Sequence, residues 1–141
     1  MKSYTVPSGG DYAIHRNGAV RLAGTERTTI SDCLFDRMGG NGLVVADYNR
    51  NTTIKGNSFR KLGDSAILLV GSAELLDTTG GDQPRFTTIE GNTAYDYGLL
   101  GKQVAAVFQA VSCQTLIKDN IFFSGPRHGG RLETFCHIAS I

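Results

Sequence analysis

The stretch that decides the fold is Gly42-Leu43-Val44-Val45-Ala46, followed by Thr53-Ile54-Lys55-Gly56-Asn57-Ser58-Phe59. Twenty-four residues earlier, Gly18-Ala19-Val20-Arg21-Leu22 overlays the first part, and Thr29-Ile30 with Phe35 overlays the second. A third copy begins at residues 66–70 and is interrupted before Thr88-Ile89. A fourth begins at residues 104–108 and continues with Leu116-Ile117. Four copies of one pattern indicate a repeat architecture.

Each copy contains two or three short runs of β type and no amphipathic helix. Alternation places Ile30, Ile54, Ile89 and Ile117 on the same face of successive copies. A repeat of this length cannot enclose a core alone, but stacked copies can pair equivalent strands in parallel. The interior would then hold the isoleucine column and a second column, Val20–Val44–Leu68. The sequence therefore predicts an all-β, right-handed parallel β-helix of about four to five coils.

One segment allows a second interpretation. Residues 98–111 have the composition of a short helix, with Ala105, Ala106 and Ala110. Their valine and phenylalanine content and their place in the repeat favour a strand.

A polar position recurs at Cys33, Asn57, Asn92 and Asn120. Asparagine tolerates the left-handed backbone of a sharp bend, and stacked amides can hydrogen-bond to one another. We therefore expect bends and an asparagine ladder here, interrupted at Cys33. The three cysteines, Cys33, Cys113 and Cys136, have the spacing of neither a disulfide framework nor a zinc site, so each is expected to be a small buried hydrophobic residue.

The 141 residues suffice for one domain, in which residues 1–127 form the coils and residues 71–86 an insertion loop. Residues 1–17 would form a partial first coil. Residues 128–141 leave the repeat register and are expected to be an irregular or truncated tail. The 14 basic and 13 acidic side chains nearly cancel, which gives no electrostatic reason to expect nucleic acid or a membrane as partner. The N-terminal residues do not resemble a secretory signal, and the compartment stays open.

Several stretches resemble proteins of the right-handed parallel β-helix, or pectin-lyase-like, superfamily, and in particular large right-handed β-helix domain proteins. The stretches are residues 18–27, 40–44, 48–50, 82–85, 101–103, 108–110 and 120–127. The resemblance implies a carbohydrate-binding or polysaccharide-processing protein, and the habit of the family is extracellular. It also implies further β-helix coils, or a capping partner, at the C-terminal end. The alternatives are a non-catalytic structural or binding module and an inactive fragment.

Enzymes of this superfamily act on the outer face of a parallel sheet that long loops border. A glycoside hydrolase needs two carboxylates, for which Asp64 and Asp82 are the candidates. A polysaccharide lyase needs a base and cations beside a uronate carboxylate, which Lys102 and Arg85 could supply. Gln103, Gln109 and Arg127 are candidates for substrate binding. The histidines lack metal-ligand spacing, so neither a metal nor a cofactor is expected.

Overall fold

Short strands joined by tight bends make up the chain in the computed structural model, which describes residues 8–9, 12–13, 15–71, 81–133 and 139–140. No helix occurs within these ranges. The fold is all-β, and every strand pair except the hairpin β1 (Ser8–Gly9) and β2 (Tyr12–Ala13) is parallel. Residues 98–111 contain a strand and no helix, as the repeat register indicated.

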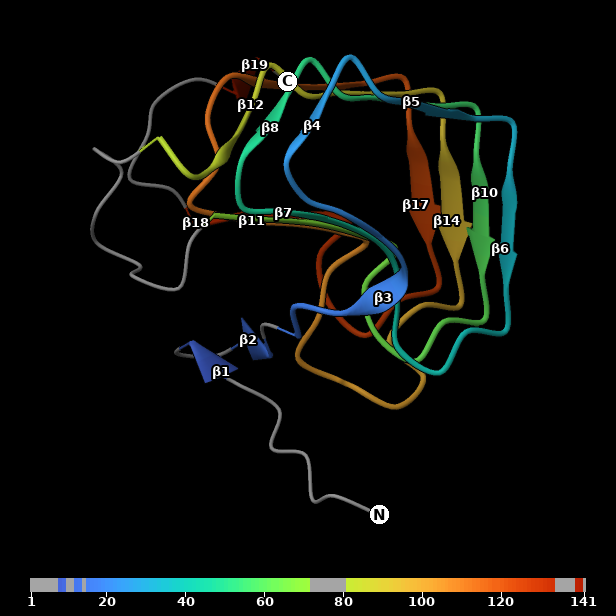
Figure 1. Ribbon diagram of the computed structural model, residues 1–141. Helices are drawn as coiled ribbons and strands as arrows, with labels where there is room; N and C mark the ends of the chain where they lie inside the picture. Colours follow the sequence, from blue (N-terminus) through green and yellow to red (C-terminus); the bar gives the residue numbers. More distant parts are fainter. Residues whose placement is uncertain (1–7, 10–11, 14, 72–80, 134–138, 141) are drawn as a thin grey trace.

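The strands belong to four parallel sheets that surround a common interior (Figure 1). Sheet I contains β3 (Gly18–Leu22), β7 (Asn41–Ala46), β11 (Ile67–Val70), β15 (Val107–Ala110) and β18 (Gly130–Glu133). Sheet II contains β4 (Thr25–Glu26), β8 (Asn49–Arg50) and β12 (Pro84–Arg85). Sheet III contains β5 (Thr29–Ser31), β9 (Thr53–Lys55), β13 (Thr88–Glu90), β16 (Thr115–Lys118) and β19 (Ala139–Ser140). Sheet IV contains β6 (Leu34–Asp36), β10 (Ser58–Arg60), β14 (Thr93–Tyr95) and β17 (Ile121–Phe123).

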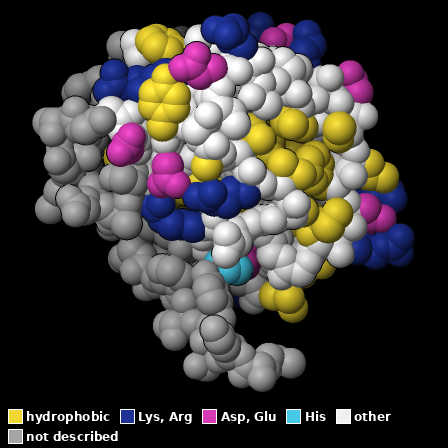
Figure 2. Space-filling model, viewed as in Figure 1, with side chains coloured by type: hydrophobic (Ala, Val, Ile, Leu, Met, Phe, Trp, Pro, Cys, Tyr) yellow, Lys and Arg dark blue, Asp and Glu magenta, His cyan; other side chains and the backbone are white. Residues whose placement is uncertain are grey.

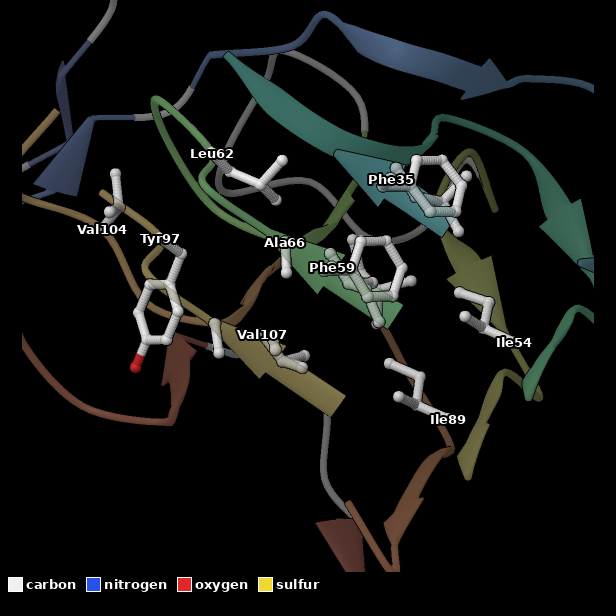
Figure 3. Close-up of a cluster of buried hydrophobic side chains, with 14 of the residues drawn as sticks. Phe35, Ile54, Phe59, Leu62, Ala66, Ile89, Tyr97, Val104 and Val107 are labelled. Carbon is white, nitrogen blue, oxygen red and sulfur yellow. The ribbon is translucent and has the colours of Figure 1, made fainter. Parts of the chain in front are cut away.

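The isoleucine column is confirmed. Ile30 pairs with Ile54, Ile54 with Ile89, and Ile89 with Ile117 in sheet III. Ile54 and Ile89 are fully buried in the core (Figure 3), where they meet side chains from sheets I and IV. On sheet IV, the rings of Phe35 and Phe59 stack with their centroids 4.5 Å apart.

The expected column Val20–Val44–Leu68 is wrong in two respects. Val20 pairs with Leu43 rather than Val44. The register of β3 on β7 is therefore shifted by one residue from the constant spacing at which the sequence analysis overlaid the two copies. Val44 does pair with Leu68, but the two side chains belong to a second apolar cluster, apart from the main core. The inner column of sheet I consists instead of Leu43, Ile67 and Val107, against which Val20 packs.

Many strands end in one residue with left-handed backbone, and these residues form columns of their own. After sheet III they are Asp32, Gly56, Gly91 and Asp119, and after sheet IV they are Arg37, Lys61, Asp96 and Ser124. The left-handed residue thus lies one position before the recurrent asparagine, which corrects our placement of the bend. Glycine relieves the strain at Gly56 and Gly91, and the other bends accept side chains at a cost.

The asparagine ladder is present. Asn57 Oδ1 accepts the backbone N–H of Cys33 at 3.0 Å, Asn92 Oδ1 accepts that of Asn57 at 3.0 Å, and Asn120 Oδ1 accepts that of Asn92 at 2.8 Å. The side-chain amides are also linked, from Asn57 to Asn92 and from Asn92 to Asn120, each at 3.0 Å. Asn57 and Asn92 are both 1% exposed, so these bonds satisfy groups that water cannot reach.

Two cysteines differ from our expectation. Cys33 is exposed and has a free thiol. Cys113 is buried, as expected, but it is disulfide-bonded, which the spacing of the cysteines did not indicate. Cys136 lies outside the described residues.

Both ends of the stack expose part of the core. At the end formed by β3 to β6, Val20, Leu22, Ile30 and Met38 are only partly buried. Hydrophobic side chains gather there on the face turned towards the viewer in Figure 2. At the other end, β18 and β19 lie within residues 128–141, for which we expected irregular structure. They extend sheets I and III by one strand each.

The insertion is described only in residues 71 and 81–86.

Candidate functional site

Two of the candidate residues lie where the chain passes from sheet IV to sheet I. Asp64 follows β10, and its Oδ2 lies 3.2 Å from Nδ1 of His15. The Asp64 side chain is 15% exposed and that of His15 is 22% exposed, so the pair is accessible but largely enclosed. A Cβ added to Gly101 would lie 2.1 Å from Asp64 Oδ1, which shows how closely the backbone approaches this carboxylate.

Lys102 lies in the following connection from sheet IV to sheet I, between β14 and β15. Its Nζ donates to the carbonyl oxygens of Gly98 and Leu99 at 2.9 and 3.0 Å, which folds the side chain back on its own loop. Gln103 follows it and is exposed, as is Arg127 in the next connection from sheet IV to sheet I. The two connections touch, because a Cβ on Gly98 would lie 2.5 Å from Pro126.

The other two proposed catalytic residues lie beside sheet II. Asp82 is exposed, and the loop around it is held by Arg50, whose guanidinium donates to the carbonyls of Gly81 and Gln83 at 2.8 and 2.7 Å. Arg85 pairs with Arg50 in the sheet, and its buried Nε has no partner among the described residues. The structure therefore does not bring Asp82 and Arg85 together with Asp64 and Lys102.

Gln109 lies inside the molecule. It is 1% exposed, pairs with Leu69 in sheet I, and accepts a hydrogen bond from Ser112 Oγ at 2.9 Å. A substrate on the outer surface would not reach it. Strand alternation predicts this result, because Gln109 lies two residues after the core residue Val107 and therefore points to the same side of the strand.

A column of polar and aromatic side chains on the outer face of sheet IV was missed by the sequence analysis. The ladder places Asp36, Arg60, Tyr95 and Phe123 in register. Asp36 Oδ1 lies 3.1 Å from Arg60 Nε, and the rings of Tyr95 and Phe123 stack at 5.1 Å with 5° between their planes. Phe123 is 50% exposed. The sequence does contain a signal for this column. In each copy of the repeat, the column residue directly follows the phenylalanine or alanine that points into the core.

Charge in this column is paired. The hydrogen bond from Arg60 lowers the pKa of Asp36, with a further contribution from Arg37. The same bond to Asp36, together with one to Tyr95, raises the pKa of Arg60. The column therefore presents an ion pair and an aromatic stack side by side at neutral pH.

The lowered pKa of Asp36 leads to a testable prediction about the stability of the fold at low pH. A carboxyl whose pKa is lower in the folded state stabilises the fold above its unfolded value of 3.8, and this contribution is lost as the pH falls through the lower folded value. We expect Asp36→Asn to lower the thermal midpoint at neutral pH and to make no difference at a pH well below 3.8. Circular dichroism melts across this range measure it, with the exposed Asp82→Asn as control. A deficit of Asp36→Asn that persists in acid would contradict it.

A groove of about 310 Å³ lies beside this column. It is lined by Arg37, Met38, Gly39, Lys61, Gly63, Leu99 and Leu100. Leu99 and Leu100 are 49% and 74% exposed, so the wall of the groove that they form is apolar and open to solvent.

Among the residues that the structure describes, no three His, Cys, Asp or Glu side chains gather closely enough to hold a metal ion. The described part of the chain also has no helix with the length and hydropathy needed to cross a bilayer. Comparison with protein-family models, with curated protein sequences and with solved structures finds no match to this chain.

Proposed function

We propose that the chain is a run of coils from a right-handed parallel β-helix, and that its outer surface binds polysaccharide. The order of the sheets supports the first part, because in each of the first three copies the chain passes through sheets I, II, III and IV in turn and then returns to sheet I beside the previous strand. Parallel connections of this kind are right-handed in the great majority of proteins. Further coils or a capping partner at the C-terminal end belong to the same proposal.

The observation that carries the binding proposal is the outer column on sheet IV. Sugar rings have apolar C–H faces, which pack on aromatic side chains, and a rim of hydroxyls, which bond to charged groups. The stack of Tyr95 with the half-exposed Phe123 offers the first kind of contact, and Arg60 and Asp36 offer the second. Successive side chains in such a column lie about 4.8 Å apart, so the column presents a linear series of contacts to an extended chain.

A second candidate function is polysaccharide processing, for which the pair of Asp64 and His15 is the favourable observation. A largely enclosed carboxylate in contact with a histidine can orient that histidine for proton transfer. Lys102 lies in the adjoining loop as a cation. The geometry favours binding over processing, because Asp82 and Arg85 are held beside sheet II and Gln109 is enclosed.

Affinity electrophoresis in gels that contain neutral or uronate-bearing polysaccharides tests the binding proposal. We expect retardation of the wild-type chain by at least one polysaccharide, and about tenfold weaker binding for Tyr95→Ala or Arg60→Ala. Lys55→Ala, on the outer face of sheet III, is the matched control and should bind like the wild type. Binding by none of the polysaccharides, or equal binding by all variants, would overturn the proposal.

The same polysaccharides, assayed for new reducing ends and for unsaturated products, separate the two candidates. Cleavage that Lys102→Ala or Asp82→Ala abolishes would favour an enzyme. Binding that survives in both variants, without cleavage by the wild type, would favour a module.

A further inference from the structure

The groove of about 310 Å³ adjoins the outer column of sheet IV along the chain. Arg37 lines the groove and directly follows Asp36 of the column. Lys61 lines it in the same way and directly follows Arg60. A polysaccharide bound along the column would therefore lie beside the groove. The volume is at the lower end of the range for small-molecule sites, which suits one sugar residue with its substituent.

Leu99 and Leu100 form an apolar wall of the groove that backbone hydrogen bonds hold in place. The N–H of Leu99 donates to the carbonyl of Leu62 at 3.0 Å. The N–H groups of Leu100 and Gly101 both donate to the carbonyl of Gly63, at 3.0 and 2.8 Å. The side chains of the two leucines nevertheless remain exposed. The groove is thus preformed, and an apolar group on a ligand would gain by covering this wall.

Gly39 leaves the groove open at a point where the chain would accept a side chain. A Cβ added to Gly39 would meet no atom within 4 Å. Its backbone is not left-handed, so the conformation does not require glycine there. A larger residue at this position can therefore be used to fill the groove without strain in the fold.

The charged side chains that line the groove are both basic. Arg37 contacts Asp36, with Nη2 lying 3.0 Å from Oδ2. Lys61 forms no ion pair with any residue in the described part of the chain. No acidic side chain occurs among the described residues that line the groove. Charge complementarity therefore favours a ligand with a negative group at Lys61 and an apolar group against the leucines.

Resting on the proposed function, we propose that the groove binds a polysaccharide substituent that carries both a carboxylate and a methyl group, as a pyruvate ketal on a sugar residue does. The carboxylate pairs with Lys61, beside the guanidinium of Arg37, and the ketal and methyl carbons cover Leu99 and Leu100. An O-acetyl group lacks the charge, and a plain uronate lacks the apolar part. Neither of these substituents matches both features of the groove.

The test titrates the full chain with three methyl galactosides and follows the backbone amides by NMR. The first bears a pyruvate ketal, the second an ethylidene acetal without the carboxylate, and the third is a galacturonoside without the ketal carbons. We expect saturable binding of the first, and binding about tenfold weaker for the other two, because one loses a charge-assisted bond and the other loses two apolar carbons. Amide shifts should centre on Lys61, Leu99 and Leu100 and leave Lys55 on sheet III unchanged.

Two variants of the protein test the same contacts from the other side. Gly39→Leu fills the groove, and Lys61→Asn removes the cation while keeping a residue that tolerates the left-handed backbone at this position. Each should bind the ketal probe about tenfold more weakly than the wild type, in line with the loss of one charged or apolar contact. Lys55→Ala removes one positive charge elsewhere and is the matched control, which should bind normally. Circular dichroism melts like that of the wild type show that the variants are folded.

Absence of saturable binding, equal affinities for the three probes, or groove variants that bind like the wild type would each overturn the inference. Affinity electrophoresis separates this result from a failure of the proposed function. If polysaccharide retards the chain but the ketal probe does not bind, only the inference is wrong. If no polysaccharide retards the chain, the proposed function is wrong, and the inference that rests on it is wrong as well.

Discussion

Replacing Phe59 by alanine should lower the free energy of unfolding by about 3–5 kcal/mol. Phe59 is fully buried at the centre of the core (Figure 3), with its ring stacked on that of Phe35 at 4.5 Å. The ring also fills the space over Gly42, where an added Cβ would lie only 2.9 Å from Phe59 Cδ1. Alanine would leave a cavity that the flat sheets on either side cannot close by small movements.

The measurement is equilibrium unfolding in urea, supported by a thermal melt in which the midpoint should fall by about 10 °C for a chain of this size. Phe123→Ala is the matched control, since Phe123 lies on the same sheet but is half exposed on its outer face. It should cost about 1 kcal/mol through the loss of its stack with Tyr95. Equal losses for the two variants would show that the interior of sheet IV is not the core described above.

Replacing Asn92 by leucine should have the second large effect. Leucine has similar volume, but it removes the acceptor for the buried N–H of Asn57 and the donor to the carbonyl of Ile54, which are bonded at 3.0 and 2.9 Å. Each buried group left without a partner costs about 1–3 kcal/mol. The bond to Asn120 Oδ1 is lost as well.

Cys33→Ala is the control for the ladder, because Cys33 occupies the first rung and contributes only its backbone N–H to it. Its effect should stay within about 0.5 kcal/mol, as for other exposed positions. Urea unfolding of both variants measures the difference. If Asn92→Leu were as stable as Cys33→Ala, the ladder would be a by-product of the stack and would not stabilise it.

The sequence predicted those parts of the fold that repeat. Ile30, Ile54, Ile89 and Ile117 could be placed in one column because each follows a threonine or leucine and precedes a bend by a fixed number of residues. The asparagine ladder could be placed for the same reason. Parallel pairing then follows, since it brings like residues together in register.

The parts that do not repeat were not predictable in the same way. Gly18 corresponds to Gly42 in the sequence repeat, but in the structure it pairs with Asn41. An alignment of the copies without gaps cannot reveal such a shift of one residue. Asp64, Asp82 and Lys102 lie in connections of unequal length, so the repeat gives no rule for their relative positions. The outer column of Asp36, Arg60, Tyr95 and Phe123 is regular but changes chemistry at every step, which hides it from a search for similar residues.

The unequal spacing of the ladder has a consequence for how such a protein changes over time. Asn57 lies 24 residues after Cys33, Asn92 lies 35 after Asn57, and Asn120 lies 28 after Asn92, yet all four positions meet in register. The extra residues between strands leave the pairing of the ladder positions untouched. The chain can therefore accept insertions in the connections between strands, or gain whole repeats by tandem duplication, without a change in the packing of its core.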